Sequence, residues 1–356
     1  MAVPIRVLLV EDSPVVLTIL RRLLAETPDM EIVGTAHNGI EALALIPQVN
    51  PTVICTDLHM PKMGGLELTR RVMAECPRPI LVISASVQAE DSHTVFQLLQ
   101  AGALDVFPKP RTGLSSEYEQ MKIDLLNRIR VLAGVSVFTR RPASSSEIKP
   151  VPLPSSLPAI SVPRDICFPR VVAIGASTGG PQAMHTILSQ IPRSFAVPIL
   201  CVQHISEGFL TGLVNWLAAE CSLKVRIAQP GEIPQVGTVY FPPERCHLQL
   251  DPHGRFLLPQ GPPVAGHCPS ATILFRSVAA YYRRSAVGIL LTGMGRDGAE
   301  GLAELAQASG ITIAQDEASC VVFGMPKEAI ALGAVQQVLP LDQIAPILLH
   351  KIFAPL

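Results

Sequence analysis

The 356-residue sequence lacks an apolar run long enough to cross a membrane. Its first apolar stretch, residues 1–10, is too short for a signal peptide and leads straight into Glu11 and Asp12. The sequence also lacks an excess of either charge, with a formal net charge of −1 and an isoelectric point near 6.8. These absences argue against export, membrane insertion and a basic surface for nucleic acid or anionic lipid. We therefore expect a cytoplasmic protein.

Cysteine and histidine patterns typical of disulfides or structural metals are also missing. Eight cysteines occur without any C-x-x-C pair, and most lie in apolar runs, where a free thiol packs as a small hydrophobic group. Nine histidines show no matched metal spacing, because Cys246-His247 and His267-Cys268 are isolated pairs. The sequence thus indicates a reduced protein and argues against a zinc hydrolase.

What the sequence does contain is enough apolar material, 48% of its residues, for two domains. Between residues 5 and 132, short apolar runs alternate with amphipathic segments. This alternation predicts an α/β fold with a doubly wound, parallel, five-stranded sheet. The expected strands are Ile5–Val10, Glu31–Ala36, Thr52–Thr56, Ile80–Ser84 and Leu104–Phe107.

Polar residues follow four of these strands. Glu11 and Asp12 follow the first strand, Asp57 the third and Lys109 the fifth, while Ser84 ends the fourth. Since carboxyl ends of parallel strands share one edge, we expect the three acids to surround Mg²⁺, with Asp57 as a phosphoryl acceptor. Lys109 and Ser84 would contact the phosphoryl oxygens. Singly, each acid is also explained as a solvated loop carboxylate or a helix cap.

This half resembles a response-regulator receiver domain. The matching stretches are V-E-D-S-P (10–14), T-D-L-H-M-P-K-M-G-G-L-E-L (56–68), V-I-S-A-S (82–86) and F-P-K-P (107–110). The resemblance implies that Asp57 is phosphorylated, that Glu11 and Asp12 complete the metal site, and that Ser84 and Lys109 form the switch. It also implies a histidine kinase as phosphodonor.

Residues 133–168 are rich in proline and serine, which favours an extended spacer over a packed core. The sequence therefore predicts a receiver domain over 1–132, a linker over 133–168 and a second domain over 169–356. The composition alone is equally compatible with an inert tether. After the linker the α/β rhythm returns, which predicts a larger, Rossmann-like, mostly parallel sheet. Several short apolar runs between residues 223 and 258, separated by proline and glycine, predict an antiparallel addition to this sheet.

The segment from Val171 to Pro181 reads as a buried strand, a turn of small residues and a helix start. Gly175, Ser177 and Gly179 match the G-x-S-x-G spacing, in which a serine stands on a sharp turn as a nucleophile. The same residues would also suit a phosphate-binding loop or a helix cap.

Two further expected strands end near candidate partners for Ser177. His204 follows the run 197–202, and Asp297 follows 287–291, so nucleophile, base and orienting acid would meet at one sheet edge. Backbone N–H groups of the turn 293–295 and of Thr178 are candidates for the oxyanion site. A less favoured set pairs Asp251 with His253 or His267, in the chain order of α/β-hydrolases.

This second half resembles the catalytic domain of chemotaxis protein-glutamate methylesterases. The matching stretches include I-G-A-S-T-G-G (174–180), G-H-C-P-S (266–270), L-T-G-M-G-R-D-G-A-E-G (291–301) and A-Q-D-E-A-S-C-V-V-F-G-M-P (314–326). The resemblance implies a Ser177, His204 and Asp297 triad, the Met294 N–H in the oxyanion site, methylated chemoreceptors as substrates, glutamine deamidation and no cofactor in this domain. At Thr272 many relatives carry Asp, and we expect the change to affect a peripheral substrate contact.

Two other functions fit the same sequence. One is an esterase or amidase of this fold in a two-component pathway outside chemotaxis. The other is a signalling module whose second domain binds a partner without catalysis, although the complete Ser177, His204 and Asp297 set argues against it.

Overall fold

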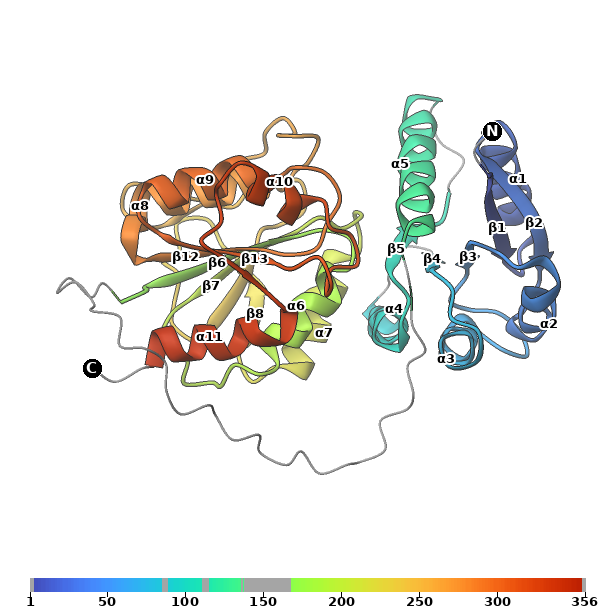
Figure 1. Cartoon of the computed structure of the whole chain (residues 1–356), viewed down its shortest axis with the longest axis horizontal. Helices are drawn as coiled ribbons and strands as arrows, with labels where there is room; N and C mark the ends of the chain where they lie inside the picture. The colour runs from blue at the N-terminus through green and yellow to red at the C-terminus, as the bar shows by residue number, and fades with distance from the viewer. Residues whose placement is uncertain (1–2, 85–88, 111–114, 136, 138–167, 354–356) are drawn as a thin grey trace.

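The computed structural model describes residues 3–84, 89–110, 115–135, 137 and 168–353. Its strands form a five-stranded sheet, a seven-stranded sheet and a two-stranded sheet, and helices flank the two larger sheets (Figure 1). The predicted α/β class is therefore confirmed. Most of the predicted linker, residues 138–167, lies outside the described residues, so the boundaries 1–132, 133–168 and 169–356 stay predictions.

The N-terminal sheet has the order β2-β1-β3-β4-β5, and all of its strand pairs are parallel. Alternate residues of β1 face opposite sides: Val7 and Leu9 pack with α1 and α5, while Leu8 and Val10 pack with α2 to α4. Both faces of the sheet are therefore covered. The elements are β1 (Ile5–Val10), α1 (Pro14–Ala25), β2 (Met30–Ala36), α2 (Gly39–Val49), β3 (Val53–Thr56), α3 (Gly65–Glu75), β4 (Ile80–Ser84), α4 (Ala89–Ala101), β5 (Asp105–Pro108) and α5 (Ser115–Ala133).

The C-terminal sheet has the order β14-β13-β12-β6-β7-β9-β8 and is parallel throughout. Helices α8 to α10 lie on one face, and α6, α7 and α11 on the other (Figure 1). Its elements are β6 (Val171–Ala176), α6 (Gly180–Leu188), β7 (Ile199–Gln203), α7 (Leu210–Glu220), β8 (Lys224–Ile227), β9 (Thr238–Phe241), β10 (Gln249–Leu250), β11 (Phe256–Leu257), α8 (Ala271–Tyr282), a 3₁₀ turn (Arg283–Ser285), β12 (Ala286–Leu290), α9 (Ala299–Gln307), β13 (Ile311–Gln315), α10 (Met325–Ala331), β14 (Gln337–Leu339) and α11 (Leu341–Phe353).

The antiparallel addition predicted for residues 223–258 is smaller than expected. Only β10 and β11 pair antiparallel, whereas β8 and β9 extend the main sheet in parallel. All four residues of β9 are buried, as in a strand covered on both faces, which is the usual environment of a parallel strand. The prediction of antiparallel pairing was therefore wrong for β8 and β9 and right for β10 and β11.

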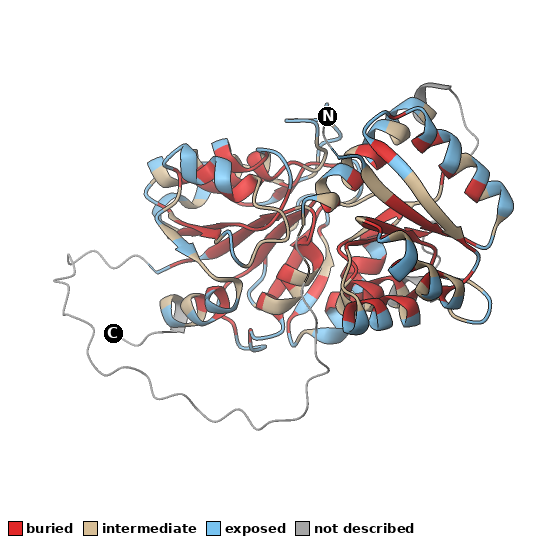
Figure 2. Ribbon diagram, turned by 45° about the vertical axis from the view of Figure 1, so that its right-hand side comes forward, coloured by how far each residue is buried: buried red, intermediate tan, exposed pale blue. Residues whose placement is uncertain are grey.

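The two α/β units meet through α4 of the first and α7 of the second. The ring of Phe96 stacks on that of Trp216, with centroids 5.3 Å apart and an angle of 13° between the planes. Both side chains are buried, and one cluster of buried apolar residues includes them and continues from one unit into the other. Figure 2 shows buried segments in both units. This contact holds the middle of α4 against α7 of the second unit.

Candidate active site and phosphorylation site

Ser177 lies directly beyond β6, in the turn that leads into α6. Its N–H donates to the carbonyl of Thr292, 3.0 Å away, which ties the turn to the end of the neighbouring strand β12. Gly179 has a φ of 78°, and a Cβ there would come within 2.6 Å of Val321. A Cβ on Gly293 would lie 2.7 Å from the Ser177 Cβ. Glycine at 179 and 293 therefore permits both the sharp turn and the close approach of the following loop.

His204 and Asp297 form the central contact of this edge. The His204 Nε2–H donates to Asp297 Oδ2 across 2.8 Å, and the two side chains are 7% and 0% exposed. The other ring nitrogen, His204 Nδ1, is buried and has no hydrogen-bond partner. None of the hydrogen bonds described for the chain joins the Ser177 hydroxyl to this ring. Nδ1 is thus the nitrogen left to accept a proton.

Asp297 is held by the start of α8. Its carboxylate accepts from the Ser270 hydroxyl (2.6 Å), the Ala271 N–H (2.7 Å) and the Thr272 N–H (3.1 Å). Burial by itself would raise the pKa of Asp297, but the hydrogen bond and charge of His204 and the bonds from α8 outweigh it and hold the pKa well below its usual range. Asp297 is therefore ionised and pre-oriented.

Sequence reasoning missed α8 and with it Ser270. The signal was present, because a serine directly before a long apolar stretch is a typical helix N-cap, and Ser270 accepts from the Ile273 N–H. The expectation for Thr272 was wrong. Its side chain is 3% exposed and its hydroxyl accepts from the Gly298 N–H, so it braces the turn that carries Asp297 instead of contacting substrate.

The alternative acid, Asp251, closes its own turn. Its Oδ1 accepts the backbone N–H groups of His253 and Arg255, each at 2.8 Å. Among the described residues, no hydrogen bond joins Asp251 to the ring of His253 or His267. The geometry favours Asp297 as the orienting acid.

The proposed oxyanion donors lie on the two turns beside Ser177. No hydrogen bond within the described chain uses the N–H of Met294 or of Thr178, although the neighbouring Gly293 N–H donates to Val322. A hydrogen bond from Thr292 Oγ1 to the Thr178 carbonyl (3.0 Å) fixes the second turn. Two N–H groups without a partner among the described residues, beside the candidate nucleophile Ser177, are of the kind that stabilise a developing oxyanion.

The acidic residues predicted at the first sheet edge also meet. Carboxylate oxygens of Glu11, Asp12 and Asp57 lie within 4.8 Å of one another. Lys109 Nζ donates to Asp57 Oδ2 (2.7 Å) and Glu11 Oε1 (3.0 Å), and the Lys109 N–H donates to the Ser84 carbonyl (2.7 Å). All five residues predicted from this half therefore lie together.

Negative charge is poorly balanced at this cluster. Burial raises the pKa of Glu11 and of Asp57, and in Glu11 the charge of Asp57 adds to the increase, although Lys109 opposes it in both. Glu11 Oε2 is buried without a hydrogen-bond partner. Burial would lower the pKa of Lys109, but its bonds to Asp57 and Glu11 outweigh this and raise it.

The first unit lies against the rim of the Ser177 site. Asp105 of β5 accepts from the Thr178 hydroxyl (3.3 Å) and pairs with Arg128 of α5 (2.6 Å), whose Nη2 is 3.5 Å from Ser206 Oγ. The Gln182 side chain donates to the carbonyls of Leu99 (2.6 Å), in the last turn of α4, and of Ala103 (2.7 Å), just beyond the helix.

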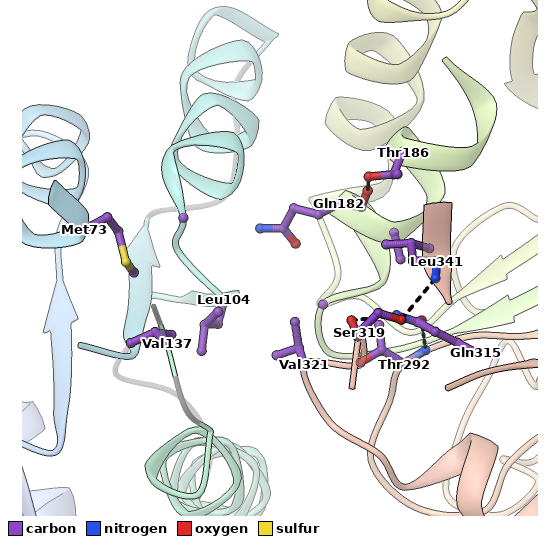
Figure 3. Close-up of a pocket in the computed structure, with 13 residues that line it drawn as sticks. Met73, Leu104, Val137, Gln182, Thr186, Thr292, Gln315, Ser319, Val321 and Leu341 are labelled. Carbon is purple, nitrogen blue, oxygen red and sulfur yellow. Dashed lines mark hydrogen bonds between the residues drawn. The ribbon is translucent and has the colours of Figure 1, made fainter. Parts of the chain in front are cut away.

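A cavity of about 210 Å³ remains between these contacts. Figure 3 shows Met73, Leu104 and Val137 of the first unit on one side, facing Gln182 and Val321 on the other. The interface beside the Ser177 turn is therefore incompletely packed.

Comparisons with known proteins cover both units. The response regulator receiver domain family matches residues 7–114, and the CheB methylesterase family matches residues 172–348. A protein-glutamate methylesterase/protein-glutamine glutaminase of Hahella chejuensis is 44% identical over 345 residues, with 96% of this chain and 97% of that protein covered. One from Syntrophus aciditrophicus is 41% identical, with 97% of each chain covered.

Among solved structures, the CheB methylesterase catalytic domain of Thermotoga maritima is 35% identical, with a TM-score of 0.50. The alignment covers 51% of this chain and 98% of that domain. Within the described residues no helix is both long and apolar enough to span a membrane. The matched domains, their order and the near-complete coverage of the relatives show that this chain belongs to the CheB family of protein-glutamate methylesterase/protein-glutamine glutaminases.

Proposed function

We propose that the protein is a phosphorylation-regulated serine hydrolase that removes methyl groups from glutamyl methyl esters on chemoreceptors and deamidates particular receptor glutamines. The observation that carries the proposal is the buried 2.8 Å hydrogen bond between His204 and Asp297 at the sheet edge that also carries Ser177. Family membership supplies the substrate class. A cytoplasmic location stays a prediction from the sequence.

In the proposed reaction the Ser177 oxygen attacks the ester carbonyl carbon while its proton moves to His204 Nδ1. Asp297 accepts the Nε2–H, fixes this tautomer and stabilises the charged ring that forms. Because Asp297 already has four hydrogen-bond donors, it needs no rearrangement during the step.

The carbonyl oxygen becomes an oxyanion, for which the N–H groups of Met294 and Thr178 are the proposed donors. As the carbon–oxygen bond to the methoxy group breaks, His204 returns the proton and methanol leaves. Water then attacks the acyl-serine, again with His204 as base, which releases the glutamate side chain and regenerates Ser177. With a glutamine side chain the leaving group is ammonia.

The proposed activity is tested by incubating the protein with receptor membranes that carry labelled methyl esters and measuring labelled methanol. We expect release by the wild-type protein and none above background by Ser177→Ala. Hydrolysis of a soluble aryl ester without methanol release would indicate an esterase with another substrate. No reaction of Ser177 with a fluorophosphonate would indicate a binding module.

The receiver domain is proposed to accept a phosphoryl group on Asp57 from a histidine kinase. The orphaned Glu11 Oε2 and the three converging carboxylates fit Mg²⁺, which Glu11, Asp12 and Asp57 would hold. When bound, the cation neutralises charge on the phosphoryl oxygens. Lys109 is within 2.7 Å of Asp57 and would pair with the phosphoryl group, while Ser84 would hydrogen-bond to it.

The unphosphorylated receiver domain is proposed to cover the active-site rim, and phosphorylation to weaken that contact. The bonds from Thr178 to Asp105 and from Gln182 to α4 support this, since they join the receiver to the residues that follow the nucleophile. Closed and open forms would be in equilibrium, and about 1.4 kcal/mol changes the open fraction tenfold where the closed form dominates. A shortened chain of residues 164–356 should hydrolyse a soluble ester faster than the unphosphorylated protein. Equal rates would favour a simple tether.

A further inference from the structure

His267 lies directly on the imidazole of His204. The centroids of the two rings are 3.7 Å apart and their planes differ by 7°, so one ring covers a face of the other. His267 makes no ring hydrogen bond among the described residues. The reaction proposed above uses no part of this side chain.

The backbone around His267 is built to hold the ring in place. Val264 and His267 exchange two backbone hydrogen bonds of 3.0 Å around a two-residue turn, in which Ala265 and Gly266 have φ of 51° and 85°. Three residues later, the Ser270 hydroxyl donates to Asp297. The segment 264–270 thus places the His267 ring against His204 and the Ser270 hydroxyl against Asp297.

Three charged or titratable groups influence His267: His204, Asp297 and, from the receiver domain, Arg128. Burial is the main cause that lowers the pKa of His267, to about 4; the electrostatic influence of His204 and the charge of Arg128 act in the same direction, although Asp297 opposes them. His267 is therefore neutral near pH 7. A neutral ring adds no charge beside the imidazolium that His204 forms during the proposed reaction, whereas a second imidazolium would repel it.

We propose that His267 is a positioning residue whose ring keeps His204 in the plane that directs Nε2 to Asp297 and leaves Nδ1 for the Ser177 proton. Among the described residues, the His204 ring makes one hydrogen bond, to Asp297, which fixes one edge of the ring but permits tilting about that bond. A flat side chain at 3.7 Å removes this freedom and excludes water from one face. The inference rests on the proposed serine-hydrolase function.

The test compares His267→Ala, His267→Leu and His267→Phe in the full-length protein, with His253→Ala, on an exposed turn, as the control. Ala removes the ring, Leu fills volume without a flat face, and Phe keeps the flat face without nitrogens. We expect Ala and Leu to lower kcat about ten- to a hundredfold with KM nearly unchanged, because misplacement of a catalytic group by about 1 Å has effects of this size. Phe should stay within about threefold of wild type.

Two further measurements separate positioning from general structural damage. The rate at which a fluorophosphonate labels Ser177 should fall with kcat in the Ala and Leu variants. The downfield proton resonance of the His204–Asp297 hydrogen bond should persist in His267→Phe and broaden or vanish in His267→Ala. Circular dichroism melting identifies any variant that fails to fold. If His267→Ala does not fold, the comparison of His267→Phe with His267→Leu tests whether the flat ring is required.

Wild-type labelling rates and a sharp resonance in His267→Ala would overturn the inference. Equal losses in His267→Phe and His267→Ala would also overturn it, since the ring nitrogens and not the flat face would then matter. A wild-type protein that no fluorophosphonate labels would overturn the proposed hydrolase function itself, and the role of His267 with it.

Discussion

At the edge of the receiver sheet, Glu11 and Asp57 are buried side by side with one lysine between them. At the corresponding edge of the methylesterase sheet, one buried carboxylate, Asp297, accepts four hydrogen bonds. The pKa values of Glu11 and Asp57 are raised, whereas that of Asp297 is lowered. Both sites lie at the carboxyl ends of parallel strands. Only at the second site do hydrogen bonds from the protein stabilise the ionised carboxylate fully.

The difference follows from what each site is proposed to do. A site that must take up a cation and a phosphoryl group gains by leaving negative charge uncompensated, because the ligand then supplies the balance. A site that stabilises a transient imidazolium gains by having its carboxylate fixed and ionised beforehand. The comparison can be tested at five points, from the largest expected effect to the smallest.

The largest effect is expected at the preorganised site. Ser177→Ala and His204→Ala should each lower methyl-ester turnover by about 10⁴-fold or more, and the double variant should be little worse, because nucleophile and base act as one unit. Methanol release under saturating receptor measures the loss, with His253→Ala as the control. Near-normal turnover in His204→Ala would remove this ring from the mechanism.

The receiver site should depend on an added cation where the catalytic site does not. Labelling of Asp57 by a small acyl phosphate should fall by at least about 100-fold when a chelator removes Mg²⁺, since the acids then repel the phosphoryl group. Asp57→Asn should abolish labelling. Mass spectrometry of the phosphorylated peptide provides the measurement, and labelling that persists in the chelator would place the acceptor elsewhere.

Neutralising the two carboxylates should have opposite effects on stability. Asp297→Asn should lower the free energy of unfolding by about 3 kcal/mol, because it breaks a buried pair, whereas Asp57→Asn without Mg²⁺ should raise the melting temperature by about 2–5 °C. Hydrogen exchange of the β3 and β7 amides reports the two domains separately. Destabilisation of β3 by Asp57→Asn would contradict the account of uncompensated charge.

The same pKa shifts give opposite pH dependences. Asp297, with a folded-state pKa below the ordinary value of about 3.9, stabilises the fold above about pH 4, and this contribution is lost as the pH falls further. Glu11 and Asp57, whose pKa values are raised, bind protons more tightly when folded, so their contribution declines as the pH rises above about 4. Melting curves of Asp57→Asn and wild type between pH 4 and 7 should diverge with rising pH.

The smallest effect is expected at the interface that joins the two sites. Gln182→Ala removes two hydrogen bonds to the end of α4 and should raise basal hydrolysis of a soluble ester by about threefold to tenfold. Trp216, the only tryptophan of the chain, stacks on Phe96 and should report opening through its fluorescence. Gln190→Ala, on an exposed part of the second unit, is the matched control. Unchanged activity and fluorescence in Gln182→Ala would show that these bonds do not hold the domains closed.

The local sequence determined where the helices and strands form and which strand ends carry the reactive side chains. Alternating apolar runs specified five parallel strands in the receiver, and the residues just beyond them, Asp57 and Lys109, lie together as predicted. Strand ends likewise predicted Ser177, His204 and Asp297 as a catalytic set; the structure brings His204 and Asp297 into contact, and the role of the set stays a prediction. Strand ends are informative because parallel strands bring their carboxyl ends to one edge whatever fills the loops.

Only the tertiary structure decided which side chains pack against, or hydrogen-bond to, His204 and Asp297. Ser270 and His267 reach the active site from the segment before α8, which strand ends did not point to, and β9 pairs in parallel in the main sheet with both of its faces buried. The placement of Phe96 on Trp216 depends on packing between side chains 120 positions apart. Contacts of this kind are set by the shape and charge of surfaces that form only after the strands have assembled, and periodicity along the chain does not encode them.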